Sequence, residues 1–462
     1  MLMRLKKFSV RLTALIFLLA VGRAADKPDF ITWDSAKDSV SADVHHQPLW
    51  PVLEGIAHKT GWHIFVEPAT SRTIDVKFQN EPRTDALKKI LGDLNFAFVP
   101  KTNEPSRLYV FTTRMENATR RVISTNIVAA AKPAKHVPNQ LMVKLKPGAD
   151  IDTLAKSVGA KVVGRDDKNG IYLLEFADAA TTDGALASLK ANGDVASVEY
   201  NNYFDPPATP SRIANSSATP PVSLSLDNSK AGDPCNPVGG LIDTRIQSLG
   251  TQLDSFVLPT IAVAGDATPS ATEPTHATSM AETILRAVSQ STGGSSAVKI
   301  LPVDVYGGSE LASTWNVALG VKAAVDGGAT VLNMSLGSTS DSPILDSIIA
   351  QAQAKGVVIF AAAGNQPVSS ATYPAAITGV NAVTALSAPG QLASYANYGS
   401  FVSMALPGAS VVYLGSQAFV VQGTSPATAY ASGIAAGTKG VNCPPWAQVE
   451  QAMQQKFPVP AN

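Results

Sequence analysis

The chain has 462 residues, enough for two to four domains of ordinary size, and 45% of them are hydrophobic, enough to bury a large core. Its 36 basic and 36 acidic residues give a formal net charge of zero. This balance argues against nucleic acid or an anionic membrane surface as the main partner.

Residues 1–24 have the pattern of an export signal. The basic stretch MLMRLKKFSVR precedes the apolar stretch LTALIFLLAVG, and Gly22 and Ala24 place small residues before a cut after Ala24. A structural helix or a membrane anchor is the alternative, but the apolar stretch is shorter than the roughly 18–20 residues that a span needs. We therefore expect the mature chain to be exported to the periplasm, the cell envelope or the medium.

Residues 26–115 are expected to form a small α+β domain. Two helical stripes run over 49–57 and 87–94, and the strand-like runs WHIFVE, TIDVKF and LYVFTT flank them. This block also contains four of the six histidines of the chain: His45, His46, His58 and His63. They could suggest a metal site, but their scatter favours solvated side chains, and no metal site is assigned.

Residues 136–204 are expected to form a second small α+β domain. The runs QLMVKLKPG, KVVG, GIYLLEF and VASVEYN indicate strands, with helical stretches near 150–158 and 183–191 between them. Residues 205–230 follow, rich in Pro, Ser, Thr and Asn, with little to build a core from. We expect them to be an exposed linker.

The last block, residues 231–462, alternates short apolar strands with helix-sized segments, a pattern typical of a parallel sheet covered on both faces. Binding and catalytic sites of such sheets form at the carboxyl ends of the strands. Polar residues follow the expected strands at those ends: Asp243, Asn333, Ser335 and Asn365. The chain is thus predicted to have an α/β parallel-sheet domain preceded by two small α+β domains.

Two further residues of this block point to hydrolytic chemistry. Ser425 lies in QGTSPATAYASG, which fits either a nucleophile at a helix start or a small-residue packing stretch. A serine nucleophile needs a base, and His276 is the only histidine after the linker. It opens HATSMAETIL, a helix start after a loop, where an imidazole can face a cleft.

Five motifs of this block, in chain order, resemble those of the subtilisin-like serine proteases: LIDTRI, HATSMAETI, VLNMSLGS, VVIFAAAGN and GTSPATAYASG. The order Asp, His, Ser is the order of that family, and the resemblance covers essentially the whole block. It implies that Ser425 is the nucleophile, His276 its general base and Asp243 the residue that orients the imidazole. It further implies that Asn365 helps to hold the oxyanion. The resemblance places the substrate cleft at Ser335, Leu336 and Gly337.

Some positions depart from the family pattern. The motif glycine after Asp243 and its threonine is Arg245, and the glycine after His276 is Ala277. Asp266, ten residues before His276, is a competing carboxylate, but no threonine follows it. None of these departures removes one of the three catalytic residues that the resemblance implies.

The only cysteines are Cys235 and Cys443, too few for a disulfide framework or a four-thiolate metal site. The residues leave two options open, one bridge or two buried thiols. In the fold that the resemblance implies, the two cysteine segments could approach each other. We therefore expect a Cys235–Cys443 disulfide.

The two N-terminal blocks also carry resemblances. Residues 136–204 resemble the inhibitor-type prodomain that precedes subtilases, which implies folding assistance and inhibition until a cut near the linker. Residues 38–112 resemble, more loosely, the short N-terminal domain of secretins and TonB-dependent receptors. That implies a Gram-negative envelope and a role in binding another protein.

The sequence therefore predicts an exported serine endopeptidase, made as a proenzyme, that acts on polypeptide substrates and has its own prodomain as intramolecular inhibitor. The expected reaction requires no cofactor. Structural calcium is common in the family, but no loop with EF-hand spacing is present, so no site is assigned. The alternative is a catalytically weak or inactive envelope protein that binds a partner through residues 26–115; the intact triad residues favour the enzyme.

Overall fold

The computed structural model forms two compact units, residues 1–130 and residues 131–462, and each is described by itself. The expected export signal at residues 1–24 lies outside the described residues, as do residue 119, residues 123–135 and most of 214–234. No helix in the described part of the chain is long and apolar enough to cross a bilayer. The described residues are 30–34, 38–67, 70, 72–100, 106–118, 120–122, 136–213, 224, 226–228, 235–249, 252–387 and 390–460.

The first unit is an α+β domain, as expected for residues 26–115. Its two helices bury the predicted stripes, with Leu53, Ile56, Leu87 and Ile90 fully buried between two small sheets. The strand orders are β1-β2-β4 and β5-β6-β3-β7. The elements of this unit are β1 (Phe30–Asp34), β2 (Ser39–Pro48), α1 (Leu49–Thr60), β3 (His63–Val66), β4 (Thr73–Pro82), α2 (Arg83–Leu91), β5 (Asn95–Val99), β6 (Arg107–Phe111), the 3₁₀ turn η1 (Met115–Asn117) and β7 (Arg120–Val122).

The histidines of this unit do not form a described metal site. His45 lies on β2 and contacts the carboxylate of Asp43, with 2.9 Å between its Nε2 and Asp43 Oδ1, while His63 opens β3. The side chains of His46 and His58 are outside the described set. Among the residues that the structure describes, no three His, Cys, Asp or Glu side chains are grouped to hold a metal ion.

The second unit begins with the α+β domain expected at residues 136–204. Its four strands form an antiparallel sheet in the order β11-β8-β10-β9, and a short strand from far along the chain, β16, pairs with the outer edge of β11. Tyr203 and Phe204 of β11 pair with Ser313 and Ala312 of β16. The elements are β8 (His136–Leu145), α3 (Ile151–Ser157), β9 (Lys161–Asp166), β10 (Ile171–Glu175), α4 (Ala179–Lys190) and β11 (Val195–Phe204).

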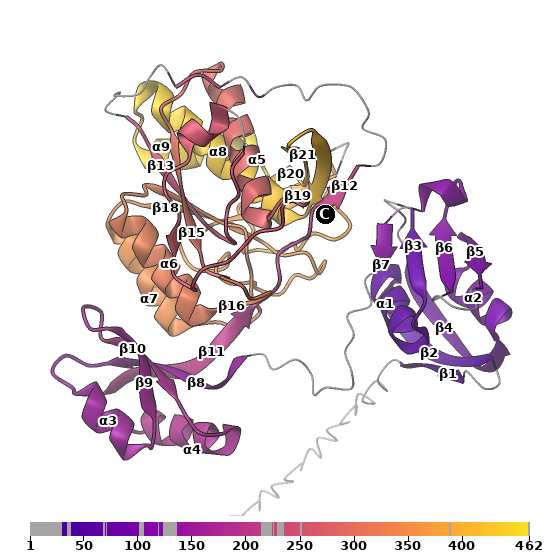
Figure 1. The fold of residues 1–462 in the computed structure, drawn as a ribbon, viewed down its shortest axis with the longest axis horizontal. Helices are drawn as coiled ribbons and strands as arrows, with labels where there is room; N and C mark the ends of the chain where they lie inside the picture. Colours follow the sequence, from indigo (N-terminus) through magenta and orange to yellow (C-terminus); the bar gives the residue numbers. More distant parts are fainter. Residues whose placement is uncertain are drawn as a thin grey trace, which may run out of the picture. The chain divides into compact units, whose positions relative to one another are not determined.

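The rest of the second unit is built on a seven-stranded parallel sheet in the order β14-β15-β13-β17-β18-β19-β20 (Figure 1). A separate antiparallel sheet has the order β12-β22-β21. The elements are β12 (Ser211–Arg212), β13 (Val238–Asp243), η2 (Gln252–Phe256), β14 (Ile261–Ala262), α5 (His276–Thr292), β15 (Lys299–Asp304), β16 (Ala312–Ser313), α6 (Thr314–Asp326), β17 (Val331–Met334), α7 (Pro343–Ala354), β18 (Val358–Ala362), β19 (Asn381–Leu386), β20 (Met404–Pro407), β21 (Ala409–Leu414), β22 (Gln417–Gln422), α8 (Thr424–Asn442) and α9 (Trp446–Lys456).

Helices cover both faces of this sheet, as the all-apolar strands predict. Helices α5 and α8 pack in one hydrophobic core, and α6 and α7 pack in the other (Figure 1). The strand order changes direction at β13, which has β15 on one side and β17 on the other. The carboxyl ends of β13, β17 and β18 therefore border the crevice where a site is expected.

The expectation of a fully exposed linker at residues 205–230 is wrong for part of its length. Ser211 and Arg212 pair with β22, Pro210 is buried, and Leu226 packs into the core that contains α5 and α8. Proline and small polar residues cannot build a core of their own, but an extended chain can still pair with an existing strand edge.

Candidate active site

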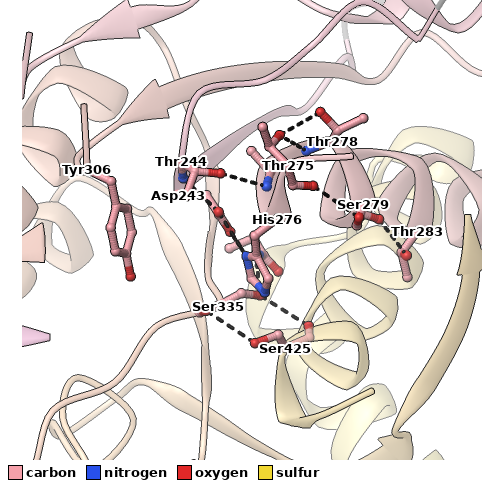
Figure 2. A network of polar contacts seen from close by, with 12 residues as sticks. Asp243, Thr244, Thr275, His276, Thr278, Ser279, Thr283, Tyr306, Ser335 and Ser425 are labelled. Carbon is pink, nitrogen blue, oxygen red and sulfur yellow. Dashed lines mark hydrogen bonds and ion pairs between the residues drawn. The ribbon is translucent and has the colours of Figure 1, made fainter. Parts of the chain in front are cut away.

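Asp243 and His276 form a buried pair at the centre of the site (Figure 2). Asp243 is the last residue of β13, and His276 is the first residue of α5. The imidazole Nδ1 lies 2.8 and 2.9 Å from the two carboxylate oxygens, and both side chains are only 2% exposed. Because a carboxylate only accepts hydrogen bonds, Nδ1 carries the proton and Nε2 presents a lone pair.

The start of α5 is fixed by side chains that the sequence places just before it. Thr275 is the N-cap, and its hydroxyl accepts from the N–H of Thr278, as a helix start requires. Thr244, the residue after Asp243, accepts the N–H of Ala277 at 3.0 Å and donates its own N–H to Asp243 Oδ1 at 2.7 Å. These contacts tie the end of β13 to the first turn of α5, so the carboxylate and the imidazole cannot shift independently.

Ser425 lies in the first turn of α8, buried beside Ser335, the residue that follows β17. Its hydroxyl donates to the carbonyl of Ser335 at 3.3 Å, and the Ser335 hydroxyl donates to the carbonyl of Ser425 at 3.1 Å (Figure 2). Asn333, buried on β17, donates its amide to the Ser335 hydroxyl. The Nε2 atom of His276 is buried and has no hydrogen-bond partner among the described residues.

Asn365 lies after β18 and contacts Thr424, the first residue of α8. Its Oδ1 accepts the N–H of Thr424 at 2.8 Å, which identifies that atom as the oxygen and leaves Nδ2 as the donor. Gly423 has φ +145°, and a Cβ there would lie 3.1 Å from Asn365 Nδ2. Glycine is therefore needed here both for its backbone conformation and for the close approach of the asparagine.

Ser335, Leu336 and Gly337, the predicted cleft residues, directly follow β17 at its carboxyl end. The carbonyl of Gly337 accepts the N–H of Asp205, which follows β11. Leu336 is buried in the same core as Phe204, the last residue of β11. The end of the 136–204 domain thus contacts the predicted substrate cleft.

A second buried carboxylate, Asp304, lies at the carboxyl end of β15, opposite Asp243 in the strand register. Burial raises the pKa of the Asp304 carboxyl, and the charge of Asp243 raises it further. The N–H groups of Gly307 and Tyr306 and the guanidinium of Arg245 act in the opposite direction. Sequence patterns did not single out Asp304, because one aspartate at the end of an apolar strand carries no motif.

The competing carboxylate, Asp266, lies outside the site. Its side chain is 95% exposed, and it pairs with Arg245 at 3.4 Å. Arg245 therefore points to an exposed partner and leaves the Asp243–His276 pair intact. Ala277 is fully buried in the core around α5, where its methyl group is accommodated.

Cys235 and Cys443 form a disulfide with 5.4 Å between their Cα atoms. Cys443 ends α8 in a left-handed conformation, and Cys235 precedes β13. The bond thus ties the far end of the helix that carries Ser425 to the strand that leads to Asp243.

Sequence reasoning did not find several side chains that organise the site. Gln247 accepts from Thr275 N and the Thr278 hydroxyl through Oε1, and its amide donates to two loop carbonyls. Thr424 holds Asn365 by both its N–H and its hydroxyl. Isolated Gln and Thr residues have no spacing rule, so only the three-dimensional arrangement identifies them.

Comparison with known proteins shows which protein family has this arrangement of residues. The subtilase family matches residues 240–456, and the fervidolysin N-terminal prodomain matches residues 123–201. The thermostable alkaline protease of Halalkalibacterium halodurans is 32% identical over 277 residues, which cover 56% of this chain and 71% of that protein. The chain belongs to the subtilase family. It is a serine endopeptidase made as a proenzyme.

A second sequence relative and a solved structure also match this chain. The M-protease of Shouchella clausii is 35% identical over 160 residues, 34% of this chain and 42% of that protein. The crystal structure of fervidolysin from Fervidobacterium pennivorans matches with a TM-score of 0.54 and 19% identity, over 70% of this chain and 57% of that one. At this identity the fervidolysin match shows the shared fold alone.

The prodomain of this subtilase contacts two helices of the protease domain at their N-termini. The side chain of Asn201 accepts the N–H of Trp315 at 3.0 Å, in the first turn of α6. The carboxylate of Glu199 accepts from the Ser342 hydroxyl and from the N–H of Ile344, at the start of α7. Each prodomain side chain thus supplies an acceptor for N–H groups that a helix start leaves free.

Proposed function

We propose that this subtilase hydrolyses peptide bonds with Ser425 as nucleophile, His276 as general base and acid, and Asp243 as the residue that orients His276. The Ser425 oxygen attacks the substrate carbonyl while its proton passes to His276 Nε2. His276 then returns that proton to the leaving amine, which leaves an ester on Ser425. Water repeats the sequence, with its proton taken by His276, and releases the acid and free Ser425.

The oxyanion of each tetrahedral intermediate is held by two donors. One is Nδ2 of Asn365, the amide donor of a side chain whose Oδ1 is held by Thr424. The other is the backbone N–H of Ser425, in the first turn of α8. Both donors are positioned before the substrate arrives, so stabilising the new charge requires little reorganisation.

The observation that carries this proposal is the buried Asp243–His276 pair. A doubly contacted Nδ1 fixes the imidazole ring and its tautomer. Nε2 has no hydrogen-bond partner among the described residues and is the ring atom left to accept a proton. The proposed reaction uses side chains of this chain and water. It assigns no residues to calcium.

The prodomain acts as the intramolecular inhibitor of this activity. Its last strand extends the protease structure through β16, and the residue after that strand bonds to Gly337 in the cleft. Residues 26–115 contribute no part of the proposed machinery and form a separate compact unit. Their proposed role is to bind a protein partner in the envelope of a Gram-negative cell after export.

The experiment that tests the function is labelling with an active-site serine phosphonate, compared with hydrolysis of a peptide substrate. The processed wild-type chain should be labelled on Ser425 and lose its peptidase activity. The Ser425→Ala chain should fold with an unchanged circular dichroism spectrum and show neither labelling nor hydrolysis. Labelling at another residue, or activity in Ser425→Ala, would contradict the proposal. An inactive binding module, the alternative from the sequence, finds no support in the comparisons.

A further inference from the structure

Asn333 is a buried amide side chain in a central strand of the parallel sheet. It lies on β17, opposite Leu241 of β13 and Phe360 of β18 in the strand register, and is 2% exposed. The other three residues of β17 are apolar and buried. A buried amide costs free energy unless its donor and acceptor are hydrogen-bonded. The proposed mechanism uses no atom of Asn333, so its presence in this strand has another physical reason.

Both ends of the Asn333 amide bond to groups that lead to α8. Nδ2 donates to the Ser335 hydroxyl at 2.9 Å, and Oδ1 accepts the hydroxyl of Ser432 at 3.0 Å. The Ser335 hydroxyl in turn donates to the carbonyl of Ser425 at 3.1 Å. A hydroxyl has one proton, and because the Ser335 oxygen accepts from the amide, that proton is left for Ser425. Asn333 therefore connects β17 to α8 twice, directly at Ser432 and through Ser335 at Ser425.

The two attachment points lie on one face of α8. Ser425 and Ser432 are seven residues apart, almost two helical turns, which corresponds to a rise of about 10 Å. A helix held at one point can pivot, whereas two points on one face fix its tilt and its rotation about its own axis. Apolar packing does not fix this rotation as sharply, because hydrophobic burial is not directional. The side chains of the network are at most 4% exposed, so water does not compete for these bonds.

The placement of α8 matters for Ser425 because its hydroxyl must change partners during the reaction. In the structure it donates to the Ser335 carbonyl, while Nε2 of His276 has no hydrogen-bond partner among the described residues (Figure 2). Transfer of the proton requires a rotation of the hydroxyl that brings it to the imidazole. The same turn of α8 carries the Ser425 N–H, the second donor to the oxyanion. A shift of this turn would therefore displace the nucleophile from His276 and the oxyanion donor from Asn365.

We propose that Asn333 is a positioning residue for Ser425, which fixes the first two turns of α8 on β17 through Ser335 and Ser432. The inference rests on the proposed function, because it takes Ser425 as the nucleophile. In this role Asn333 contacts neither the substrate nor the reacting atoms. Its loss should slow the chemical step and leave substrate binding largely unchanged, since the backbone of the cleft residues remains.

The role is tested with Asn333→Leu, which keeps the approximate size of the side chain and removes both hydrogen bonds. Asn381→Leu is the matched control, because Asn381 is a 3% exposed amide on β19 of the same sheet that bonds to Glu450 and Gln454 of α9. The kcat and KM for a chromogenic peptide are measured after limited trypsin digestion of the prodomain, together with the melting temperature.

Both leucine variants should lose thermal stability, but only Asn333→Leu should lose activity. Its kcat should fall about tenfold or more, with KM within about threefold of wild type, because even a 1 Å misplacement of reacting groups can cost about 10²-fold in rate. Asn381→Leu should keep the kcat of wild type. A purely structural role of Asn333 would give two variants with the same profile.

The two serines show whether Asn333 acts through the proposed contacts. Ser335→Ala and Ser432→Ala each remove one partner of the amide, and each should lower kcat by less than Asn333→Leu does. In double variants with Asn333→Leu the losses should be smaller than the product of the single losses, because the residues belong to one hydrogen-bond network. Losses that multiply fully would refute this route of action.

Two further results would overturn the proposal. One is a folded Asn333→Leu enzyme with a kcat within about twofold of wild type, and the other is an equal loss of kcat in folded Asn381→Leu. Labelling with the serine phosphonate separates this failure from that of the proposed function. Wild type that is active and labelled on Ser425 retains the function and leaves the positioning role alone refuted. If Asn333→Leu does not fold, Asn333→Ala and Ser432→Ala carry the same test.

Discussion

The Asp243→Asn substitution tests the centre of the proposed mechanism. The carboxylate of Asp243 accepts the Nδ1 proton of His276 from 2.8 and 2.9 Å, in a site where both side chains are 2% exposed. Asparagine has nearly the same shape, but its amide nitrogen is a donor. When that nitrogen faces the ring, Nδ1 must become the acceptor and the proton moves to Nε2. The imidazole then presents a protonated Nε2 to Ser425 and cannot accept the proton of the serine hydroxyl.

The expected loss is large because the wrong tautomer removes the base itself. A buried triad aspartate changed to asparagine lowers kcat about 10⁴-fold with the geometry intact, equivalent to about 5.5 kcal/mol of transition-state stabilisation. Asp266→Asn is the matched control in the same domain. Its side chain is 95% exposed in a pair with Arg245, and such pairs contribute about 0.2–1 kcal/mol, so its activity should remain within about fivefold of wild type.

The assay is kcat/KM for a chromogenic peptide, measured after limited trypsin digestion of the prodomain in all three proteins. Thermal unfolding of each protein shows whether the variant is folded. A folded Asp243→Asn enzyme with less than a tenfold loss would refute the assignment of Asp243. Equal losses in the two folded variants would refute it as well.

Three further predictions concern the prodomain, the disulfide and the first unit. Burial raises the pKa of Glu199 from 4.5 to about 7, and the charges of Asp346 and Asp341 also act to raise it. Protonated Glu199 therefore stabilises the docked prodomain fully below pH 4.5, and this stabilisation is lost as the pH rises through about 7. The melting temperature of the Ser425→Ala proenzyme should therefore fall from pH 5 to pH 8 more than that of the same protein with Glu199→Gln, and parallel curves would contradict this. The disulfide links cysteines 208 residues apart; replacing both by serine should lower the free energy of unfolding by about 2–5 kcal/mol in urea titrations, and an unchanged midpoint would show that the bond adds no stability. Deleting residues 26–115 should leave small-peptide hydrolysis within about twofold while changing localisation or partner capture, because that unit is compact by itself; a deletion that abolishes folding of the protease domain would show that the unit assists folding.

The sequence was most informative where chemistry requires particular residues at particular places. Apolar strands followed by polar residues predicted the parallel sheet and the edge that carries Asp243, Ser335 and Asn365. The histidine count alone left His276 as the one imidazole for Ser425 in that domain. These inferences hold because strand ends, helix starts and bases for serine are local or compositional requirements.

Strands at a sheet edge, and the middle strands of the two three-stranded sheets, were the weakest part of the sequence-based prediction. Strands β1, β2, β5 and β7 of the first unit, and β20 to β22 of the protease domain, were not predicted. Such strands are short or alternate irregularly, and they are strands because a neighbouring backbone satisfies their N–H and C=O groups. The linker shows the same effect, since Ser211 and Arg212 have no strand pattern of their own and extend along β22.

The sequence by itself determined which residues can perform the chemistry and in which domain they lie. Only the tertiary structure decided how they are engaged. It placed the Ser425 hydroxyl on the Ser335 carbonyl, bound Asp205 to Gly337 and positioned Glu199 at the start of α7. Each of these contacts joins segments about 90 to 145 residues apart, and no local pattern encodes which distant backbone group a residue will meet.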